Sequence, residues 1–357
     1  MSKGSPKSGG KKKKYAVAIA GCGRIASLLE DDPLRGKPAT HAGAYHAHPS
    51  TKIVAGCDID PGRLKKFGRR WGVSCLYGDY RKMLDKERID ILSVAVWTEA
   101  HAEIVTYAAE SGVKGIYCEK PVALNLKQAK DMIRACEKNN VALVVGHERR
   151  WDAHFVIIKD MLNKGELGKL RSITGYTLSS RPPKLSRRKH GGGTMFHDGT
   201  HLVDLFNFFA GAPEYVIGLA DRPHGKGYLE STALGIIGYK NGVKGMILGG
   251  GERKYFHFEI DIQTDTSRVL LGNHISELYM CGQSERYTGF TELKKVPFPG
   301  GLNHVNAFVG GVTGLINEME TGKISISSGR DGYKALETIM ALYRSAGKGG
   351  APVKLPL

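Results

Sequence analysis

The sequence predicts an α/β protein, in which a doubly wound parallel sheet is followed by an α+β domain with a mostly antiparallel sheet. Three observations support this prediction. Short apolar runs alternate with helical stretches between residues 15 and 146, the first run leads into a glycine-rich turn, and strand-like segments follow one another after residue 150. Alternating strands and helices are typical of parallel sheets, whereas consecutive strands are typical of antiparallel ones.

The first part of the chain contains five apolar runs that are expected to be strands of the parallel sheet. They lie at 15–20, 52–57, 89–97, 115–118 and 141–146. Helical stretches separate them, at 63–71, 80–86, 100–111 and 126–139. The first crossover is different, because Leu28 to Thr40 is rich in acidic residues, glycine and proline, which are typical of a loop. We therefore expect an insertion there.

The second part begins with a predicted helix and continues mainly with strands. The helix is expected at 153–163, and the strands at 170–178, 230–239, 244–248, 256–264 and 268–271. Two further helices are predicted at 201–209 and 332–344. We divide the chain into a tail (1–14), a first domain (15–147) and a second domain (148–357).

Composition and charge exclude several classes of protein. The chain has 357 residues, of which 41% are hydrophobic and 24% charged, as in a globular protein with room for two domains. No apolar run is long enough to span a membrane, and the first fourteen residues lack the apolar core of a secretory signal. We expect these residues to form a disordered tail, whose six lysines supply +6 of the formal charge of +17. We expect them to bind nucleic acid only nonspecifically.

The six cysteines lie far apart in the sequence and form no CxxC pair or other metal-ligand spacing. Most fall in or beside apolar runs. We therefore interpret them as unreactive thiols and place the protein in the reducing cytoplasm.

A glycine motif follows the first apolar run. Gly21 permits a tight turn, Gly23 lets the backbone approach a pyrophosphate, and Ala26 keeps the expected helix close to the strand. Asp58 follows the second strand, where a carboxylate can accept hydrogen bonds from ribose hydroxyls and would repel a 2′-phosphate. The motif predicts a dinucleotide site and favours NAD over NADP.

Lys120 stands in Glu119-Lys120-Pro121, just after the fourth apolar run. The carboxyl ends of parallel strands are where open α/β sheets bind ligands. A lysine there can donate a hydrogen bond to a substrate hydroxyl oxygen. The position therefore favours a catalytic lysine over a surface one.

His197 and His201 lie about one helical turn apart, after a run of glycines, and flank Asp198. Their side chains can converge on one point and transfer protons near neutral pH. A metal site is the alternative, but no further ligand is identifiable and we predict no metal. Asp198 has a structural alternative as a helix cap.

These motifs resemble the Gfo/Idh/MocA oxidoreductases, the group of glucose-fructose oxidoreductase and inositol dehydrogenase. The resemblance extends from Tyr15 to the C-terminus and is strongest at EKP. It is carried by GCGRIA (21–26), CDIDPGR (57–63), YCEKPVAL (117–124), GHERRWD (146–152) and GGGTMFHDGTHLVDL (191–205).

The resemblance implies a Rossmann domain, a second domain whose large sheet commonly serves homo-oligomerisation, and reversible NAD-dependent oxidation of a secondary alcohol on a sugar, glycoside or cyclitol. Lys120 and His201 take the catalytic positions, with His197 beside them. The cofactor is expected at Gly21, Gly23, Arg24, Ile25, Asp58, Trp97, Thr98, His101, Glu119, Lys120 and Arg149. The substrate is expected at Lys120, Arg150, Arg181, His197, Asp198 and His201.

Two departures from the family pattern concern the substrate. An aspartate commonly precedes the catalytic histidine by four residues, and that position holds His197 here. Trp97 stands where a proline-containing turn is usual, and it either stacks on the cofactor or fills the core. The basic segment 181–190 either attracts an acidic substrate or is solvated. Besides the enzyme, two hypotheses remain: a catalytically silent dinucleotide-binding regulator or redox sensor of the same fold, and a nucleic-acid-associated protein that binds through its basic tail.

Overall fold

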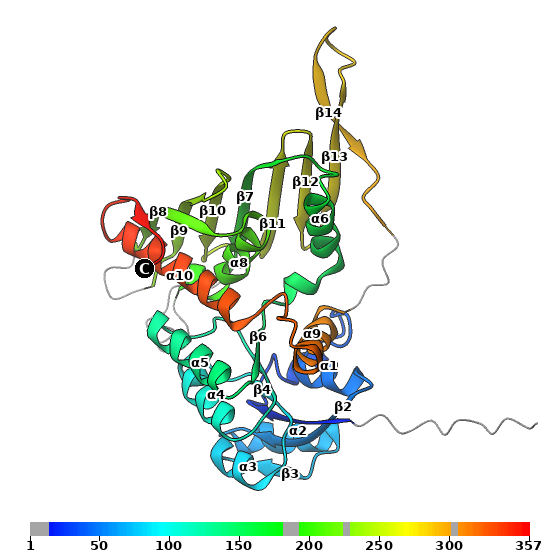
Figure 1. Cartoon of the computed structure of the whole chain (residues 1–357), viewed down its shortest axis with the longest axis vertical. Coiled ribbons are helices and arrows are strands. Elements are labelled where there is room, and N and C mark those ends of the chain that lie inside the picture. Colours follow the sequence, from blue (N-terminus) through cyan, green and yellow to red (C-terminus); the bar gives the residue numbers. More distant parts are fainter. Residues whose placement is uncertain (1–13, 181–192, 224–228, 301–305) are drawn as a thin grey trace, which may run out of the picture.

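The protein is described by a computed structural model, which covers residues 14–180, 193–223, 229–300 and 306–357. Two sheets dominate these residues (Figure 1). The six strands of the first sheet come from the first part of the sequence, and the nine strands of the second come from the rest. The predicted fold class is confirmed.

The first sheet is entirely parallel, and its strand order is β3-β2-β1-β4-β5-β6. The order reverses between β1 and β4, and open α/β sheets commonly bind ligands outside the carboxyl ends of the strands at such a point. The strands are β1 (Tyr15–Ala20), β2 (Thr51–Cys57), β3 (Cys75–Tyr77), β4 (Ile91–Val94), β5 (Gly115–Cys118) and β6 (Ala142–Val145). The short strand β3 was not predicted.

Helices connect these strands, and polar side chains cap several of them. The helices are α1 (His41–Ala47), α2 (Pro61–Trp71), α3 (Tyr80–Lys86), α4 (His101–Glu110) and α5 (Leu126–Lys138). Asp60, Asp79 and Asn125 each accept a hydrogen bond from a backbone N–H in the first turn of the helix that follows. Such caps satisfy donors that the helix itself leaves unpaired.

The first crossover contains the predicted insertion, but the helix does not begin at the glycine motif as expected. Residues 24–27 form turns, a short 3-10 helix η1 (Leu28–Asp31) follows, and α1 begins only at His41. The N–H groups of His41 and Ala42 bond to the carbonyls of Ile25 and Ala26, so α1 resumes beside the turn that the insertion leaves. The inserted residues between 28 and 40 therefore separate α1 from the glycine motif, where we expected the helix to begin.

One late segment returns to the first sheet. Helix α9 (Ala307–Thr321) buries Val312, Leu315 and Ile316 in the same cluster as Val17 of β1 and Val144 of β6. Figure 1 shows α9 beside α1. Although we assigned all of 148–357 to the second domain, this helix supplies the cover that one face of the parallel sheet needs.

The second sheet has the strand order β14-β13-β12-β11-β7-β10-β9-β8-β15, and β7 and β10 form its parallel pair. Three helices accompany it: α6 (Ala153–Asn163), α8 (Gly199–Ala210) and α10 (Gly329–Ala346). The strands are β7 (Leu170–Leu178), β8 (Pro213–Asp221), β9 (Thr232–Tyr239), β10 (Lys244–Gly250), β11 (His257–Thr264), β12 (Ser267–Gly272), β13 (Ser276–Gln283), β14 (Thr291–Val296) and β15 (Val353–Lys354).

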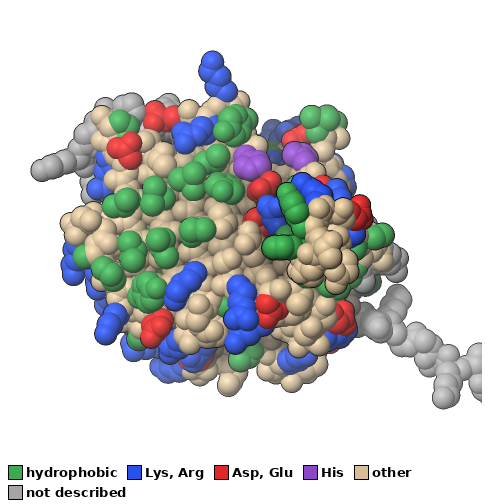
Figure 2. All heavy atoms as spheres, turned by 90° about the horizontal axis from the view of Figure 1, so that it is seen from above, with side chains coloured by type: hydrophobic (Ala, Val, Ile, Leu, Met, Phe, Trp, Pro, Cys, Tyr) green, Lys and Arg blue, Asp and Glu red, His purple; other side chains and the backbone are tan. Residues whose placement is uncertain are grey.

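The two faces of this sheet differ. Glycines of β7, β8 and β9 allow Leu202 of α8 and Leu342 of α10 to approach one face closely. On the other face Leu219, Leu234, Ile236 and Met246 are 40–50% exposed. Figure 2 shows hydrophobic side chains spread across a broad face of the molecule. An exposed apolar face of this kind is typical of an interaction surface.

Candidate active site

The candidate site lies at the carboxyl edge of the first sheet. Gly21 follows β1, Asp58 follows β2, and Lys120 follows β5. Gly21 has a φ of 90°, and a Cβ there would lie 2.5 Å from the carbonyl oxygen of Ala95. Glycine is therefore required at this turn for both its conformation and its packing.

Gly23 and Asp58 leave room for a dinucleotide. A Cβ on Gly23 would meet no atom within 4 Å, so the described chain leaves open space there. The buried carboxylate of Asp58 accepts hydrogen bonds from the N–H of Cys22 at 2.7 Å and of Asp60 at 2.8 Å. It is thereby fixed beside the glycine turn. Arg24 is exposed and Ile25 half-buried in the same turn. These residues fit a pyrophosphate and ribose, as predicted for NAD.

The two glycines make separable predictions. We expect Gly21→Ala to destabilise the fold by about 1–3 kcal/mol, because a non-glycine residue is strained at this φ. We expect Gly23→Ala to leave the unfolding midpoint unchanged and to raise the Kd for NAD about tenfold, or about 1.4 kcal/mol. Thermal denaturation and calorimetric titration with NAD measure the two effects. Unchanged NAD affinity in Gly23→Ala would exclude this turn as the pyrophosphate site.

The loop after β4 is partly a structural support. Trp97 is 55% exposed, so the hypothesis that it fills the core is wrong. Thr98 and His101 are buried, and the ring nitrogens of His101 lie 3.0 and 3.2 Å from the carbonyl oxygens of Pro121 and Val96. Burial lowers the pKa of His101. His101 thus holds the loop after β4 against the loop after Lys120, rather than presenting its ring to a cofactor as we expected.

Glu119 belongs to a buried network that the sequence analysis missed. Its Oε1 lies 2.8 Å from Nε2 of His41, whose Nδ1 lies 2.7 Å from Oγ of Ser93. Burial alone would raise the pKa of Glu119, but the hydrogen bond from His41 and the charges of His41 and Lys120 hold it below its usual value. The network fixes the backbone that carries Lys120.

Lys120 reaches across to the second domain. Its Nζ donates to the backbone carbonyl of His197 at 3.1 Å, and the residue is half-buried. His197 ends the short helix α7 (Thr194–His197), and its Nδ1 lies 3.2 Å from Oδ1 of Asp198. Asp198 occupies the N-cap position of α8, as the cap hypothesis predicts, but its side chain makes no capping hydrogen bond. The structure therefore brings Lys120, His197 and Asp198 together.

His201 completes this group from the first turn of α8. Its side chain is only 12% exposed, and its ring packs edge-on against His147 with the ring centroids 5.8 Å apart. Burial lowers its pKa well below 6.5, and the positive charge of Lys120 lowers it further. The imidazole is thus neutral near pH 7 and able to accept a proton.

The two arginines of the GHERRWD motif have different places. The guanidinium of Arg149 lies 3.7 Å over the ring of Phe258 and donates to Oδ1 of Asn273 at 2.7 Å. Arg150 is only 4% exposed, and two of its nitrogens donate to the carboxylate of Asp204 at 2.7 and 2.8 Å. Because a paired, buried guanidinium belongs to the core, Arg150 is a structural residue rather than the substrate contact we expected. Arg181 and the segment 181–190 lie outside the described residues.

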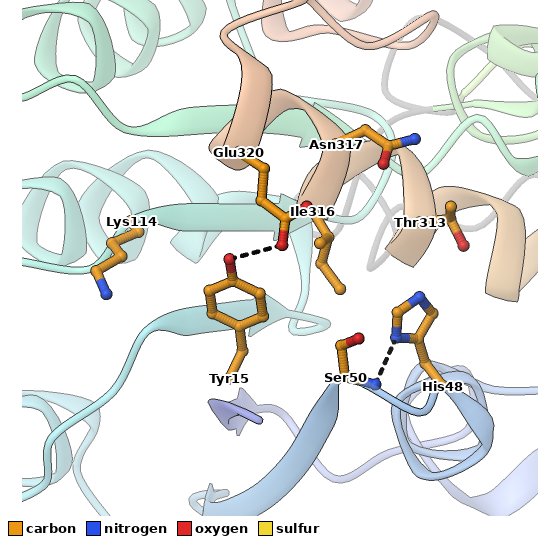
Figure 3. Close-up of a pocket in the computed structure, with 8 residues that line it drawn as sticks. All are labelled: Tyr15, His48, Ser50, Lys114, Thr313, Ile316, Asn317 and Glu320. Carbon is orange, nitrogen blue, oxygen red and sulfur yellow. Dashed lines mark hydrogen bonds between the residues drawn. The ribbon is translucent and has the colours of Figure 1, made fainter. Parts of the chain in front are cut away.

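A separate cavity of about 550 Å³ lies at the opposite, amino edge of the same sheet. Tyr15 opens β1, Ser50 precedes β2 and Lys114 precedes β5 (Figure 3). The hydroxyl of Tyr15 donates to Glu320 of α9 at 3.0 Å across this cavity. This cavity lies at the opposite end of the strands from the glycine turn, so it is not the expected dinucleotide site. Within the described ranges, no group of three or more His, Cys, Asp or Glu side chains is arranged to hold a metal ion.

Comparison with known proteins identifies the family of the chain. Residues 15–147 match the model of an oxidoreductase family with an NAD-binding Rossmann fold, GFO_IDH_MocA. Residues 155–280 match the model of the GFO/IDH/MocA C-terminal domain. Together the two models match well over half of the chain.

Curated relatives are similar over part of their length. An uncharacterized oxidoreductase YrbE of Bacillus subtilis is 30% identical over 200 residues, 56% of this chain and 55% of the relative. D-apiose dehydrogenase of Paraburkholderia graminis is 27% identical over 241 residues, which are 66% of this chain and 60% of the relative. Myo-inositol 2-dehydrogenase of Thermotoga maritima is 27% identical over 263 residues, which are 72% of this chain and 75% of the relative. The chain thus spans little more than half the length of the first two.

Solved structures show the same fold. Levoglucosan dehydrogenase in complex with NADH superposes with a TM-score of 0.81 at 19% identity, covering 96% of this chain and 100% of that one. The WlbA dehydrogenase of Bordetella pertussis, in complex with NADH and UDP-GlcNAcA, has a TM-score of 0.78 at 22% identity, covering 97% and 99%.

Proposed function

Because this chain belongs to the GFO/IDH/MocA family of oxidoreductases, whose first domain is an NAD-binding Rossmann fold, we propose that it is an NAD-dependent dehydrogenase. Its substrate is a secondary hydroxyl on a sugar, glycoside or cyclitol. The observation that supports this most is the hydrogen bond from Lys120 Nζ to the carbonyl of His197, four residues before His201, at the same edge of the sheet as Gly21 and Asp58. Relatives named inositol and apiose dehydrogenase support the substrate class.

The protein's own groups handle the proton. Lys120 donates a hydrogen bond from Nζ to the substrate oxygen and orients it. The neutral imidazole of His201 accepts the hydroxyl proton as the carbonyl forms. Asp58 holds the ribose, and the backbone at Gly23 approaches the pyrophosphate. Bound NAD supplies the chemistry of hydride acceptance.

An absorbance assay tests the proposal. The protein is mixed with NAD and, in turn, with cyclitols, free sugars, glycosides and uronates, and NADH formation is followed. We expect turnover with at least one class, and slower turnover with NADP because the carboxylate of Asp58 repels a 2′-phosphate. Binding of NAD without turnover of any class would favour a silent regulator of the same fold instead. Absence of NAD binding would contradict both.

The exposed face of the second sheet supports a homo-oligomer. Ile236 lies between Ile217 of β8 and Met246 of β10 in register, so a continuous apolar row crosses three strands. We expect Ile236→Lys to convert the assembly to monomers, because a charge cannot be buried unpaired in such an interface. Ile324→Lys, at a 65% exposed isoleucine elsewhere, is the control. Light scattering after size exclusion measures both, and an unchanged mass of Ile236→Lys would exclude this face.

The cysteines support a reducing compartment. All six are free thiols, and burial raises the pKa of Cys57 and of Cys136 to about 12, so both are unreactive near neutral pH. We therefore place the enzyme in the cytoplasm. No helix in the described part of the chain has the length and apolar character that crossing a membrane requires.

A further inference from the structure

The carboxylate of Glu148 lies beside the catalytic histidine. Glu148 begins the 3-10 helix η3 (Glu148–Trp151), where the chain turns after β6 at the carboxyl edge of the first sheet. Its Oε2 is 3.5 Å from Nδ1 of His201. This Nδ1 is buried and has no hydrogen-bond partner among the described residues. The two groups therefore face each other at slightly more than hydrogen-bond distance.

Four basic side chains influence His201. Lys120, His147, Arg149 and His197 all disfavour its charged form. His147 is occupied elsewhere, because its Nε2 lies 3.0 Å from Oγ1 of Thr200. Burial lowers the pKa of His147 to about 3, and the charges of Arg150 and Lys120 act in the same direction. A proton placed on His201 thus needs a nearby carboxylate.

Neighbouring carboxylates are engaged by other bases. Glu119 pairs with His41 at 2.8 Å, Asp198 lies 3.2 Å from His197, and Asp204 holds Arg150 at 2.7 Å. Among the described residues, Glu148 is the carboxylate that lies within ion-pair distance of the His201 ring. Burial raises the pKa of Glu148, the charges of Arg149 and Lys120 oppose this rise, and 29% of the side chain is exposed.

We propose that Glu148 is the positioning residue of His201 and that its carboxylate accepts the Nδ1–H. This inference rests on the proposed dehydrogenase function. The bond selects the tautomer in which Nε2 is unprotonated and faces the substrate hydroxyl. When the substrate O–H bond breaks, its proton forms the Nε2–H bond of His201, and Glu148 stabilises the resulting imidazolium. The hydride leaves the carbon that bears this oxygen, and bound NAD would be its acceptor. Such a contact is often long in a free enzyme and shortens in the complex.

Nitrogen NMR of histidine-labelled protein tests the pair without requiring turnover. The His201 signals are assigned by their loss in His201→Asn. In the NAD-bound protein at pH 7 we expect the Nδ1–H tautomer, and in Glu148→Met a mixture with the Nε2–H tautomer. Glu148→Asp should restore part of the wild-type signal. Glu110→Met, at an exposed glutamate that ends α4, is the matched control and should change nothing.

Kinetics test the catalytic consequence. We expect Glu148→Met to lower kcat about 10- to 100-fold with less than about threefold change in KM, because a less stabilised imidazolium makes a weaker base. A carboxylate beside an imidazole favours the charged ring, so loss of Glu148 should move the acidic limb of the pH profile of kcat/KM to lower pH.

The outcomes separate the two proposals. An unchanged His201 tautomer in Glu148→Met, or a changed tautomer with full kcat and an unmoved pH profile, would overturn the role of Glu148. A wild-type protein that oxidises no alcohol would overturn the proposed function, while the NMR comparison would still decide whether Glu148 orients His201.

Discussion

Replacing Lys120 with methionine is expected to lower kcat for alcohol oxidation about a thousandfold, within the range for loss of a positioned proton-transfer group. The Nζ of Lys120, in the first domain, donates a hydrogen bond to the carbonyl of His197 in the second. Methionine keeps about the same side-chain length but removes the donors and the charge. NAD affinity should change by less than about threefold, because Gly21, Gly23 and Asp58 hold the pyrophosphate and ribose. Steady-state kinetics and calorimetry measure the two quantities.

Lys114→Met is a matched control for this variant. Lys114 precedes β5 and Lys120 follows it, so the two lysines lie at opposite ends of one strand. The Nζ of Lys114 pairs with Asp90 at 2.7 Å and is far from the glycine turn. We expect full kcat in Lys114→Met. Turnover in Lys120→Met at the level of this control would contradict the proposed mechanism.

Breaking the buried ion pair between Arg150 and Asp204 is expected to have the largest effect on stability. Asp204→Asn should lower the free energy of unfolding by about 3–5 kcal/mol, because it removes the nearer and more deeply buried of the two carboxylates that pair with Arg150, and leaves only Asp331 at 3.4 Å. Both side chains are at most 5% exposed, and burial raises the pKa of Asp204 to about 6 although Arg150 opposes the shift. Urea denaturation followed by circular dichroism measures the loss.

Two comparisons show whether this loss comes from the unpaired charge. The double variant Arg150→Met/Asp204→Leu should recover most of the stability, since an apolar replacement of both partners removes the cost of burying charge. Asp131→Asn breaks the exposed pair with Lys127 and should cost less than about 1 kcal/mol. If Asp204→Asn were as mild as Asp131→Asn, the pair would not be the core element described above.

Local sequence signals predicted the elements whose apolar pattern matches their environment. The strand at 115–118 and the helices at 80–86 and 153–163 have the predicted bounds. Strand β14 was missed because its exposed and half-buried residues TELKKV form no apolar run. Helix α9 was missed because its sequence contains three glycines, which disfavour helices in isolation, and packing on the first sheet stabilises it.

The candidate site was predictable where position along a strand decides the role. Gly21, Asp58 and Lys120 each follow a strand, and the topology brings such residues to one edge. The family resemblance placed Arg150 at the substrate, whereas its partner Asp204 is 54 positions away and is visible only in the fold. Glu148 and His41 escaped notice for the same reason: their partners come from other elements.

The central claim is that NAD binds along the carboxyl edge of the first sheet, with its nicotinamide between Lys120 and His201. A crystal structure of the protein with NADH tests this most directly. We expect the pyrophosphate at Gly23, a ribose at Asp58, and the nicotinamide ring in contact with both catalytic side chains. NADH bound elsewhere, for example in the cavity between Tyr15 and Glu320 at the amino edge, would contradict the account.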